Sequence, residues 1–372
     1  MIEIPGAVTV EAVDPESVDQ PSPGHRAAGV TSVAAHYGDP LREQRALATD
    51  VGLVDRSHRG VLAVAGPERA GWLHSITTQY VTDLQAGQGT ELLVLSPHGH
   101  VEQHALVAED GTTVWLDTEP GRAEDLLTFL EKMRFLTRVE PRDATPEWAL
   151  LSLVGPRAGE VLAGLGVSGL AEPQVSEVPG PKFAAGTVPA GATSRYDVRP
   201  LPDGGWARRV RLGVDLLVPR PAVAQVAGAL RAAGVPVAGL WAYEAIRVAA
   251  RVPRLGLETD HRTIPAEIDL VGPAVHLDKG CYRGQETVAR VHNLGRPPRR
   301  LVLLHLDGMT TDDLPPPHTD VTTEDGRVVG FVGTAVRHFE LGPVALAVVK
   351  RNVPEGALLR VGESTAAIDP GD

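Results

Sequence analysis

The segment DKGCYRGQETVARVHN contains Cys281, the single cysteine in a chain of 372 residues. A lone cysteine is most often a small buried hydrophobe. In this segment Gly280 and Gly284 are typical of a tight loop, and the cations of Lys279 and Arg283 are near enough in sequence to stabilise a thiolate. These residues alone leave a buried thiol and a reactive thiol both open, and Lys279 could equally be a plain surface ammonium.

Two further groups of polar residues have chemical and structural interpretations. Gln285 and Glu286 begin a predicted helix, where they are either solvated or hydrogen-bonded to the preceding loop to fix its shape. Arg247 and Arg251 lie four apart in LWAYEAIRVAAR and share one face of a predicted helix, which either attracts a polyanionic ligand or is merely solvated. Tyr243 in the same helix either covers a flat ring or belongs to the core.

Composition excludes several classes of protein. A formal net charge of −12 argues against a protein that coats a nucleic-acid backbone, although a local basic groove remains compatible with it. One cysteine forms no internal disulfide, and no Cys/His cluster has zinc-site spacing, so we predict no metal site and a cytosolic location. No apolar run approaches the roughly 18 residues that cross a bilayer. The acidic first 30 residues predict a solvated, disordered tail.

A pattern of strand, Gly-Pro turn and helix occurs twice, in VLAVAGPERAGWLHSI (61–76) and LLSLVGPRAGEVLAGL (150–165). The glycine permits a sharp turn, and proline suits the first position of a helix, where no amide donor is missed. Further strands and an amphipathic helix follow each copy, the helices being predicted at 122–136 and 221–234. The duplication predicts two related α+β lobes, with a ligand cleft where they meet.

Beyond Arg300 the sequence changes to short strands separated by turn signals such as Glu-Asp-Gly, which predict a small antiparallel barrel or sandwich. The fold class is therefore α+β. We divide the chain into a tail, a first lobe, a second lobe with the cysteine segment, and a C-terminal β-barrel, at residues 1–30, 31–145, 146–298 and 299–372.

KGCYRGQE resembles the signature of the YgfZ-type folate-binding proteins, which are relatives of the aminomethyltransferase, or T-protein, of the glycine cleavage system. The stretches GLVDRSHRGVLAVAGPERAGWLHSITTQ and YEAIRVAARVPRLGLETDHRTIPAEIDL extend the resemblance over most of the chain. It implies a T-protein-like fold around an opening that accepts tetrahydrofolate. It also implies a role in iron-sulfur cluster assembly or repair, with assembly or client proteins as partners.

With the resemblance added, a functional thiol at Cys281 is favoured, with Lys279 beside it or on the glutamyl tail of folate. The resemblance places Asp215 where a carboxylate accepts hydrogen bonds from the pterin. T-proteins carry an Asp-Asp pair, one of them catalytic, where this chain has Gln103 and His104. The predicted folate-binding set is Asp215, Tyr243, Arg247, Arg251, Tyr282, Gln285 and Glu286.

Three functions compete at this point. The leading one is a folate-binding accessory protein for iron-sulfur clusters that presents Cys281. The alternative is a folate-dependent one-carbon transferase or demethylase, in which His104 or Glu102 would replace the missing acid/base carboxylate. The third is a binding module that senses folate without catalysis.

Overall fold

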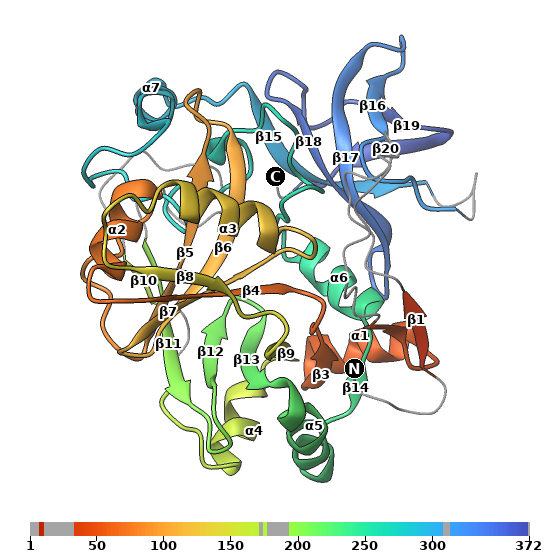
Figure 1. Ribbon diagram of the computed structural model, residues 1–372. Helices are drawn as coiled ribbons and strands as arrows, with labels where there is room; N and C mark the ends of the chain where they lie inside the picture. Colours follow the sequence, from red (N-terminus) through yellow and green to blue (C-terminus); the bar gives the residue numbers. More distant parts are fainter. Residues whose placement is uncertain (1–6, 11–32, 171–173, 177–192, 308–312, 371–372) are drawn as a thin grey trace, which may run out of the picture.

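Both predicted lobes contribute strands to one 12-stranded sheet, which forms the centre of the molecule (Figure 1). The computed structural model describes residues 7–10, 33–170, 174–176, 193–307 and 313–370. Along the sheet the strands run β14 (Val237–Ala238), β3 (Gly52–Asp55), β9 (Trp148–Val154), β13 (Gly213–Pro219), β12 (Trp206–Val210), β11 (Thr193–Pro200), β5 (Gln88–Leu95), β6 (Val101–Glu109), β7 (Thr113–Thr118), β4 (Gly60–Ala65) and β8 (Glu140–Asp143), with β10 (Gln174–Ser176) paired to β11.

The strand order confirms the duplication. The first lobe runs β8-β4-β7-β6-β5, and the second runs β14-β9-β13-β12-β11 with β3 inserted between β14 and β9. Each lobe's first strand leads into a helix, α2 (Arg69–Ile76) or α4 (Ala158–Gly164), and its last hairpin leads into α3 (Ala123–Lys132) or α5 (Val223–Ala232). The lobes meet where β11 pairs with β5, so the sheet passes from one to the other without a break.

The two Gly-Pro turns have the predicted physical basis. Gly66 and Gly155 adopt φ values of +106° and +123°, a region that side chains with a Cβ rarely enter. A Cβ on Gly66 would lie 2.3 Å from the carbonyl oxygen of Arg138, and one on Gly155 would lie 2.4 Å from that of Asp50. Both glycines therefore bring the strand-to-helix turn against a neighbouring backbone.

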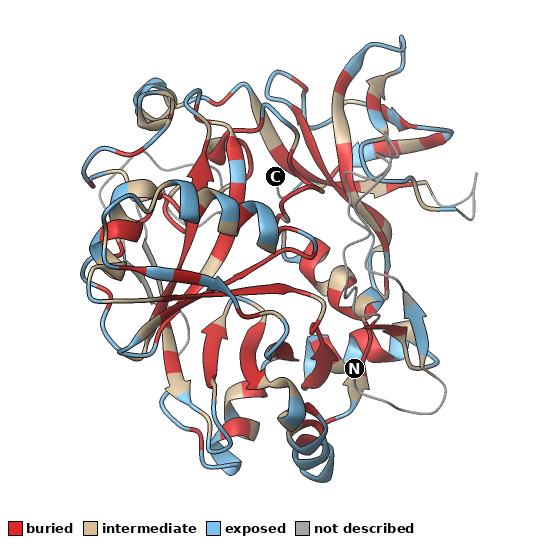
Figure 2. Cartoon of the chain, viewed as in Figure 1, coloured by how far each residue is buried: buried red, intermediate tan, exposed pale blue. Residues whose placement is uncertain are grey.

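Each lobe has its own apolar core between the sheet and its helices, and the strands are buried over most of their length (Figure 2). On α3 the predicted apolar stripe is confirmed, since Leu126 and Leu130 are fully buried. The remaining helices are α1 (Pro40–Thr49), α6 (Leu240–Ala249) and α7 (Gln285–Leu294), with short 3-10 turns at Arg220–Ala222 and Pro265–Glu267.

The start of the chain differs from the predicted boundaries. Strand β3 belongs to the sheet of the second lobe, and β2 (Val33–His36) and α1 pack against α6, so this segment lies with the second lobe although it precedes the first. Residues Val8–Val10, placed in the predicted tail, form strand β1 and pair with β2. Residues 1–6 and 11–30 of that predicted tail lie outside the described residues.

The C-terminal part is a closed antiparallel barrel, as predicted. Its strands are β15 (Arg299–Leu306), β18 (Gly342–Lys350), β17 (Val328–His338), β16 (Asp320–Thr323), β19 (Leu359–Val361) and β20 (Ser364–Ile368), in that order around the barrel. Helix α6 contacts β17 and so joins the barrel to the second lobe. None of the helices in the described part of the chain has the length and apolar character needed to cross a membrane.

Candidate functional site

A pocket lies at the junction of the two lobes, where β5 and β11 pair and α6 approaches. The space inside it amounts to about 550 Å³ when the part open to solvent is included. Its walls are formed by Arg56, Arg59, Glu91, His104, Leu106, Glu119, Tyr196, Val210, Arg211, Leu212, Asp215, Tyr243, Arg247, Val252, Pro253 and Arg254.

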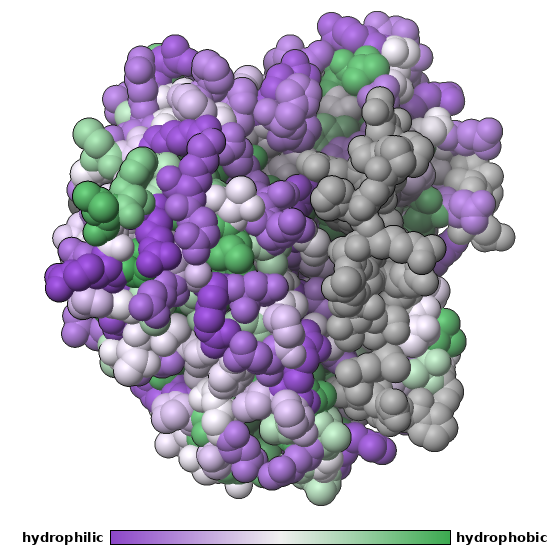
Figure 3. Space-filling view, in the orientation of Figure 1, coloured by the Kyte–Doolittle hydropathy of each residue, from purple (hydrophilic) through white to green (hydrophobic). Residues whose placement is uncertain are grey.

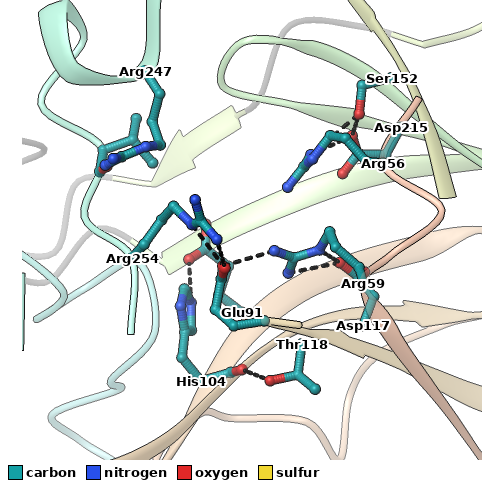
Figure 4. A network of polar contacts seen from close by, with 12 residues as sticks. Arg56, Arg59, Glu91, His104, Asp117, Thr118, Ser152, Asp215, Arg247 and Arg254 are labelled. Carbon is teal, nitrogen blue, oxygen red and sulfur yellow. Dashed lines mark hydrogen bonds and ion pairs between the residues drawn. The ribbon is translucent and has the colours of Figure 1, made fainter. Parts of the chain in front are cut away.

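One wall carries a histidine-carboxylate pair. His104 on β6 and Glu91 on β5 are diagonal neighbours on adjacent strands, and their Nε2 and Oε2 atoms lie 2.9 Å apart (Figure 4). The hydroxyl of Tyr196, from β11 of the other lobe, donates to the second oxygen of Glu91. No hydrogen bond of the His104 Nδ1 atom is found in the described residues, and His104 is part of the pocket wall.

The carboxyl of Glu91 is ionised although it is buried. Burial alone would raise its pKa, but the hydrogen bonds from His104 and Tyr196 and the charges of His104 and Arg211 lower that pKa from 4.5 to about 2. Gln103, the other residue at the T-protein Asp-Asp position, is buried on the opposite side of β6 and does not line the pocket. Of these two residues only His104 can act on a ligand here.

Asp215 lines the pocket as predicted, but its carboxylate is already occupied. Oδ1 accepts from Ser152 Oγ at 2.7 Å and from Arg56 Nη1 at 3.2 Å, and Oδ2 accepts from Arg208 Nη2 at 3.0 Å. Burial opposes ionisation, yet the charges of Arg56 and Arg208 lower the pKa of Asp215 below its ordinary value. Asp215 is therefore a fixed anion with little capacity left for a pterin.

Asp215 begins a chain of alternating charges across the pocket floor (Figure 4). Arg208 bridges Asp215 to Asp117 of the first lobe, 2.6 Å away, and Arg59 binds both Asp117 and Glu119. The chain continues into the second lobe and ends beside the barrel through these pairs: Glu119–Arg254 at 2.6 Å, Arg254–Glu244 at 2.9 Å, Glu244–Arg247 at 2.7 Å and Arg247–Glu258 at 3.2 Å.

This series of ion pairs changes the interpretation of Arg247. Its side chain is 1% exposed and is bound by two carboxylates and by Thr334 of the barrel, so it joins α6 to β17 and is not a free cation for a ligand. The predicted pairing with Arg251 on one helical face is wrong, because α6 ends at Ala249. Arg251 has a left-handed φ of +53° and binds Asp369 at 2.9 Å, away from the pocket wall.

Tyr243 occupies the pocket wall, as the resemblance implied. The guanidinium of Arg56 lies over its ring, 4.4 Å from the centroid, and burial raises the pKa of its hydroxyl. Arg211, in the turn between β12 and β13, is exposed at the pocket and has no hydrogen-bond or ion-pair partner within the described chain. Arg211 is thus the pocket cation that is free to meet an anionic ligand group.

The cysteine loop lies outside the pocket. Cys281 is a free, exposed thiol, as predicted, but it is not among the residues of the pocket wall. The loop packs on the turn between β5 and β6, where a Cβ on Gly284 would lie 2.8 Å from Gly99 Cα. His104 is three residues from the start of β6, roughly 10 Å at about 3.3 Å per residue, so the cysteine loop meets the turn of the hairpin while His104 lies further along its strand.

Lys279 does not lie against the thiol as a partner. Its ammonium is buried and donates to the backbone carbonyls of His74 and Thr77, and to that of Gln79 at 3.2 Å. Burial lowers its pKa to about 8. Lys279 therefore binds the orphan carbonyls at the end of α2 and anchors the cysteine loop to the first lobe.

The remaining signature residues also support the loop. Tyr282 is buried in an apolar cluster, with the Lys279 ammonium 5.2 Å from its ring centroid. Gln285 Nε2 donates to the backbone oxygen of Lys279 at 3.4 Å, and Glu286 is exposed on the first turn of α7. None of the three lines the pocket, so the structure gives Gln285 the predicted loop-fixing role and gives Tyr282 no contact with the pocket.

Several pocket residues escaped sequence reasoning, namely Arg56, Glu91, Glu119, Tyr196 and Arg254. Glu91 offered one signal, because a carboxylate inside the apolar run ELLVL is costly to bury without a partner. In the described residues no group of three or more His, Cys, Asp or Glu side chains is arranged to hold a metal ion.

Comparison with known proteins identifies the family to which this chain belongs. Residues 32–176 match the GCVT N-terminal domain. An aminomethyltransferase of Rubrobacter xylanophilus is 30% identical over 299 residues, which cover 76% of this chain and 74% of the relative. This chain belongs to the aminomethyltransferase family.

Other members of the aminomethyltransferase family match over similar lengths. The aminomethyltransferase of Nostoc sp. is 28% identical over 86% of this chain and 82% of its own, and a chloroplastic protein of Arabidopsis thaliana, named only as a candidate transferase, is 27% identical over 85% and 69%. The glycine cleavage aminomethyltransferase T of Bartonella henselae superposes with a TM-score of 0.69 over 98% of this chain and 92% of its own, at 18% identity. The T-protein fold is thereby confirmed.

Proposed function

We propose that this protein binds tetrahydrofolate in the pocket between its lobes and transfers a one-carbon group between the folate and an amine. Aminomethyltransferases use tetrahydrofolate, and the pocket offers an aromatic wall at Tyr243 and an exposed cation at Arg211, which suit the ring system and the anionic tail of a folate. We place this function in the cytosol, for which the single cysteine is the argument.

The His104–Glu91 pair is the observation that carries the proposal. The resemblance to T-proteins puts Gln103 and His104 at the positions of their Asp-Asp pair, and of these two only His104 lines the pocket, with its Nε2 held by Glu91. A histidine so oriented takes a proton from a reacting amine and returns it, and the ionised Glu91 stabilises the imidazolium between the two steps. Amine chemistry is thus possible without the aspartate pair.

The test separates binding from turnover. Calorimetric titration with tetrahydrofolate should give heat for the natural protein and for His104→Gln, with affinities within about threefold of each other. Turnover, followed as one-carbon folate formed from an amine donor, should fall about 10²- to 10⁴-fold in His104→Gln. Glu102→Gln is the matched control, because Glu102 lies on the same strand but pairs with Arg283 outside the pocket.

Two results would end this proposal. Absence of tetrahydrofolate binding by the natural protein would leave the pocket without its ligand. Unchanged turnover in His104→Gln would remove the proton-transfer role and leave folate binding alone.

A second candidate function rests on Cys281. Its exposed thiol is presented by a loop that Lys279 anchors, outside the pocket that contains His104, which suits a partner that meets the surface of the protein. We propose it as the contact of an accessory role in iron-sulfur cluster assembly or repair, for which other proteins must supply the remaining cluster ligands. Cys281→Ser should then lower iron-sulfur enzyme activities in cells while tetrahydrofolate affinity is unchanged; unaltered activities would exclude the role.

A further inference from the structure

A second cavity, beside α7, is lined by basic side chains and is separate from the folate pocket. It contains about 960 Å³ of space that includes open solvent, and none of its wall residues belongs to the first pocket. The wall consists of His98, His100, Arg262, Ile264, Glu267, Thr287, Arg290, Val291 and Pro298. Its polar groups come from three segments that the fold brings together: the β5–β6 turn, residues 262–267 between α6 and α7, and α7 itself.

The cations of this cavity are not neutralised by the protein. Arg262 and Arg290 are exposed, and neither guanidinium has a carboxylate partner in the part of the chain that the structure describes. Glu267 is the one acidic residue of the wall, and its carboxylate is bound by Arg299 at 2.8 Å and by the Ile264 amide at 3.1 Å. The arginines of the folate-pocket floor, by contrast, are paired with carboxylates, so this cavity stands out in a chain of net charge −12.

The walls are tied to one another before any ligand arrives. A Cβ on Gly99, at φ +82°, would lie 2.7 Å from Thr287 Cβ, which shows how closely the β5–β6 turn meets α7. The Val101 amide donates to the Thr263 carbonyl at 2.8 Å and joins the same turn to the loop that carries Arg262. A ligand therefore meets a preformed arrangement, and little binding free energy is lost in ordering it.

The basic lining continues onto the barrel. A neighbouring cavity shares Pro298 and adds Arg296, Lys350 and Arg351, of which Arg351 donates its backbone amide to Pro298 at 3.0 Å. Lys350 donates to the Val328 carbonyl at 3.0 Å. Figure 3 shows mostly hydrophilic side chains over the part of the surface where α7 lies. The two cavities meet at Pro298, and we call them together the α7 groove.

We propose that the α7 groove is a binding site for a multivalent oxyanion, a ligand that carries at least two phosphate or carboxylate groups. The planar guanidiniums of Arg262 and Arg290 bind such groups through paired N–H donors, and His98, His100 and the Thr287 hydroxyl supply further donors. The cations of the barrel side, Arg296 and Arg351, receive the second anionic group.

The experiment is calorimetry on the full chain at low ionic strength, with inorganic pyrophosphate as the phosphate probe and citrate as the carboxylate probe. Arg262→Gln and Arg290→Gln should each weaken binding about tenfold, equal to about 1.4 kcal/mol. Arg231→Gln is the matched control: it removes an exposed arginine from α5, at the opposite end of the molecule (Figure 1). A preference for pyrophosphate identifies a phosphate ligand, and a preference for citrate identifies a carboxylate ligand.

Tetrahydrofolate titrated into the same variants separates the two sites. Its affinity should not change in Arg262→Gln or Arg290→Gln, and His104→Gln should bind both probes as the natural protein does. Equal affinity of the probes for all three arginine variants would refute the site. So would a complete absence of heat with both probes, whatever the result for tetrahydrofolate.

Discussion

Glu91 makes the clearest quantitative prediction, because its ionised state depends on a specific set of partners. The difference between a pKa of 4.5 and one of about 2 corresponds to about 3 kcal/mol, at about 1.4 kcal/mol per pKa unit. The pKa is lower in the folded protein, so this stabilisation is complete above pH 4.5 and is lost as the pH falls from 4.5 toward 2.

Glu91→Gln removes this contribution. The free energy of unfolding, from urea titrations at pH 7, 5, 4 and 3.5, should be about 3 kcal/mol lower in Glu91→Gln than in the natural protein at the two higher pH values. Below pH 4.5 the difference should shrink by up to about 1.4 kcal/mol per pH unit, because the natural Glu91 then takes up a proton on unfolding. A difference that stays constant from pH 7 to pH 3.5 would refute the reasoning.

Glu102→Gln is the control for this measurement. Glu102 lies two residues from His104 on β6, but its side chain is 41% exposed and its ion pair with Arg283 spans 3.2 Å at the surface. Exposed pairs contribute about 0–1 kcal/mol, so Glu102→Gln should change the free energy of unfolding by less than about 1 kcal/mol at every pH. An effect as large as that of Glu91→Gln would show that the loss is not specific to the buried carboxylate.

Three further predictions concern the cysteine loop. Lys279→Met leaves buried carbonyls at the end of α2 without a donor and should lower the free energy of unfolding by about 2–4 kcal/mol in urea titration, whereas an unchanged value would show that water replaces the ammonium. Gly99→Ala should speed amide hydrogen exchange in residues 285–294, because its Cβ would clash with Thr287 at an unfavourable φ; protection equal to that of the natural protein would contradict this contact. In the native state one equivalent of maleimide should label Cys281, measured by mass spectrometry, without a change in melting temperature, and failure to label would contradict its exposure.

Local chemistry allowed the fold to be predicted. The Gly-Pro pairs at Gly66 and Gly155 mark a strand-to-helix turn that requires a positive φ, and this pattern is visible in the sequence. Because the pattern occurs twice, it predicts the duplicated lobes. The insertion of β3 into the second lobe was missed, because strand pairing between residues about a hundred positions apart leaves no local pattern. Arg251 was misplaced because the end of α6 at Ala249 carries no glycine or capping side chain to mark it.

The pocket was harder to predict than the fold, because its side chains also meet through contacts between distant parts of the sequence. Tyr243 and Asp215 were found through the resemblance, whereas the pairing of Asp215 with Arg56 joins residues 159 positions apart. Burial of Lys279 was equally invisible, since its carbonyl partners lie about 200 residues earlier and belong to the backbone of α2. Polar contacts between residues so far apart in sequence form only in the folded protein and cannot be predicted from composition.

The pairing of β11 with β5 also restricts how a ligand enters. The strands that carry Tyr196 and Gly89 are paired, and this pairing joins the two lobes in one continuous sheet. A hinge motion that separated the lobes would have to break the sheet at this point. A ligand must instead enter the pocket past the side chains at its opening, or after a rotation of the barrel relative to α6. The outline of the pocket is therefore set by the sheet, so the pocket selects ligands by their shape as well as by their charge.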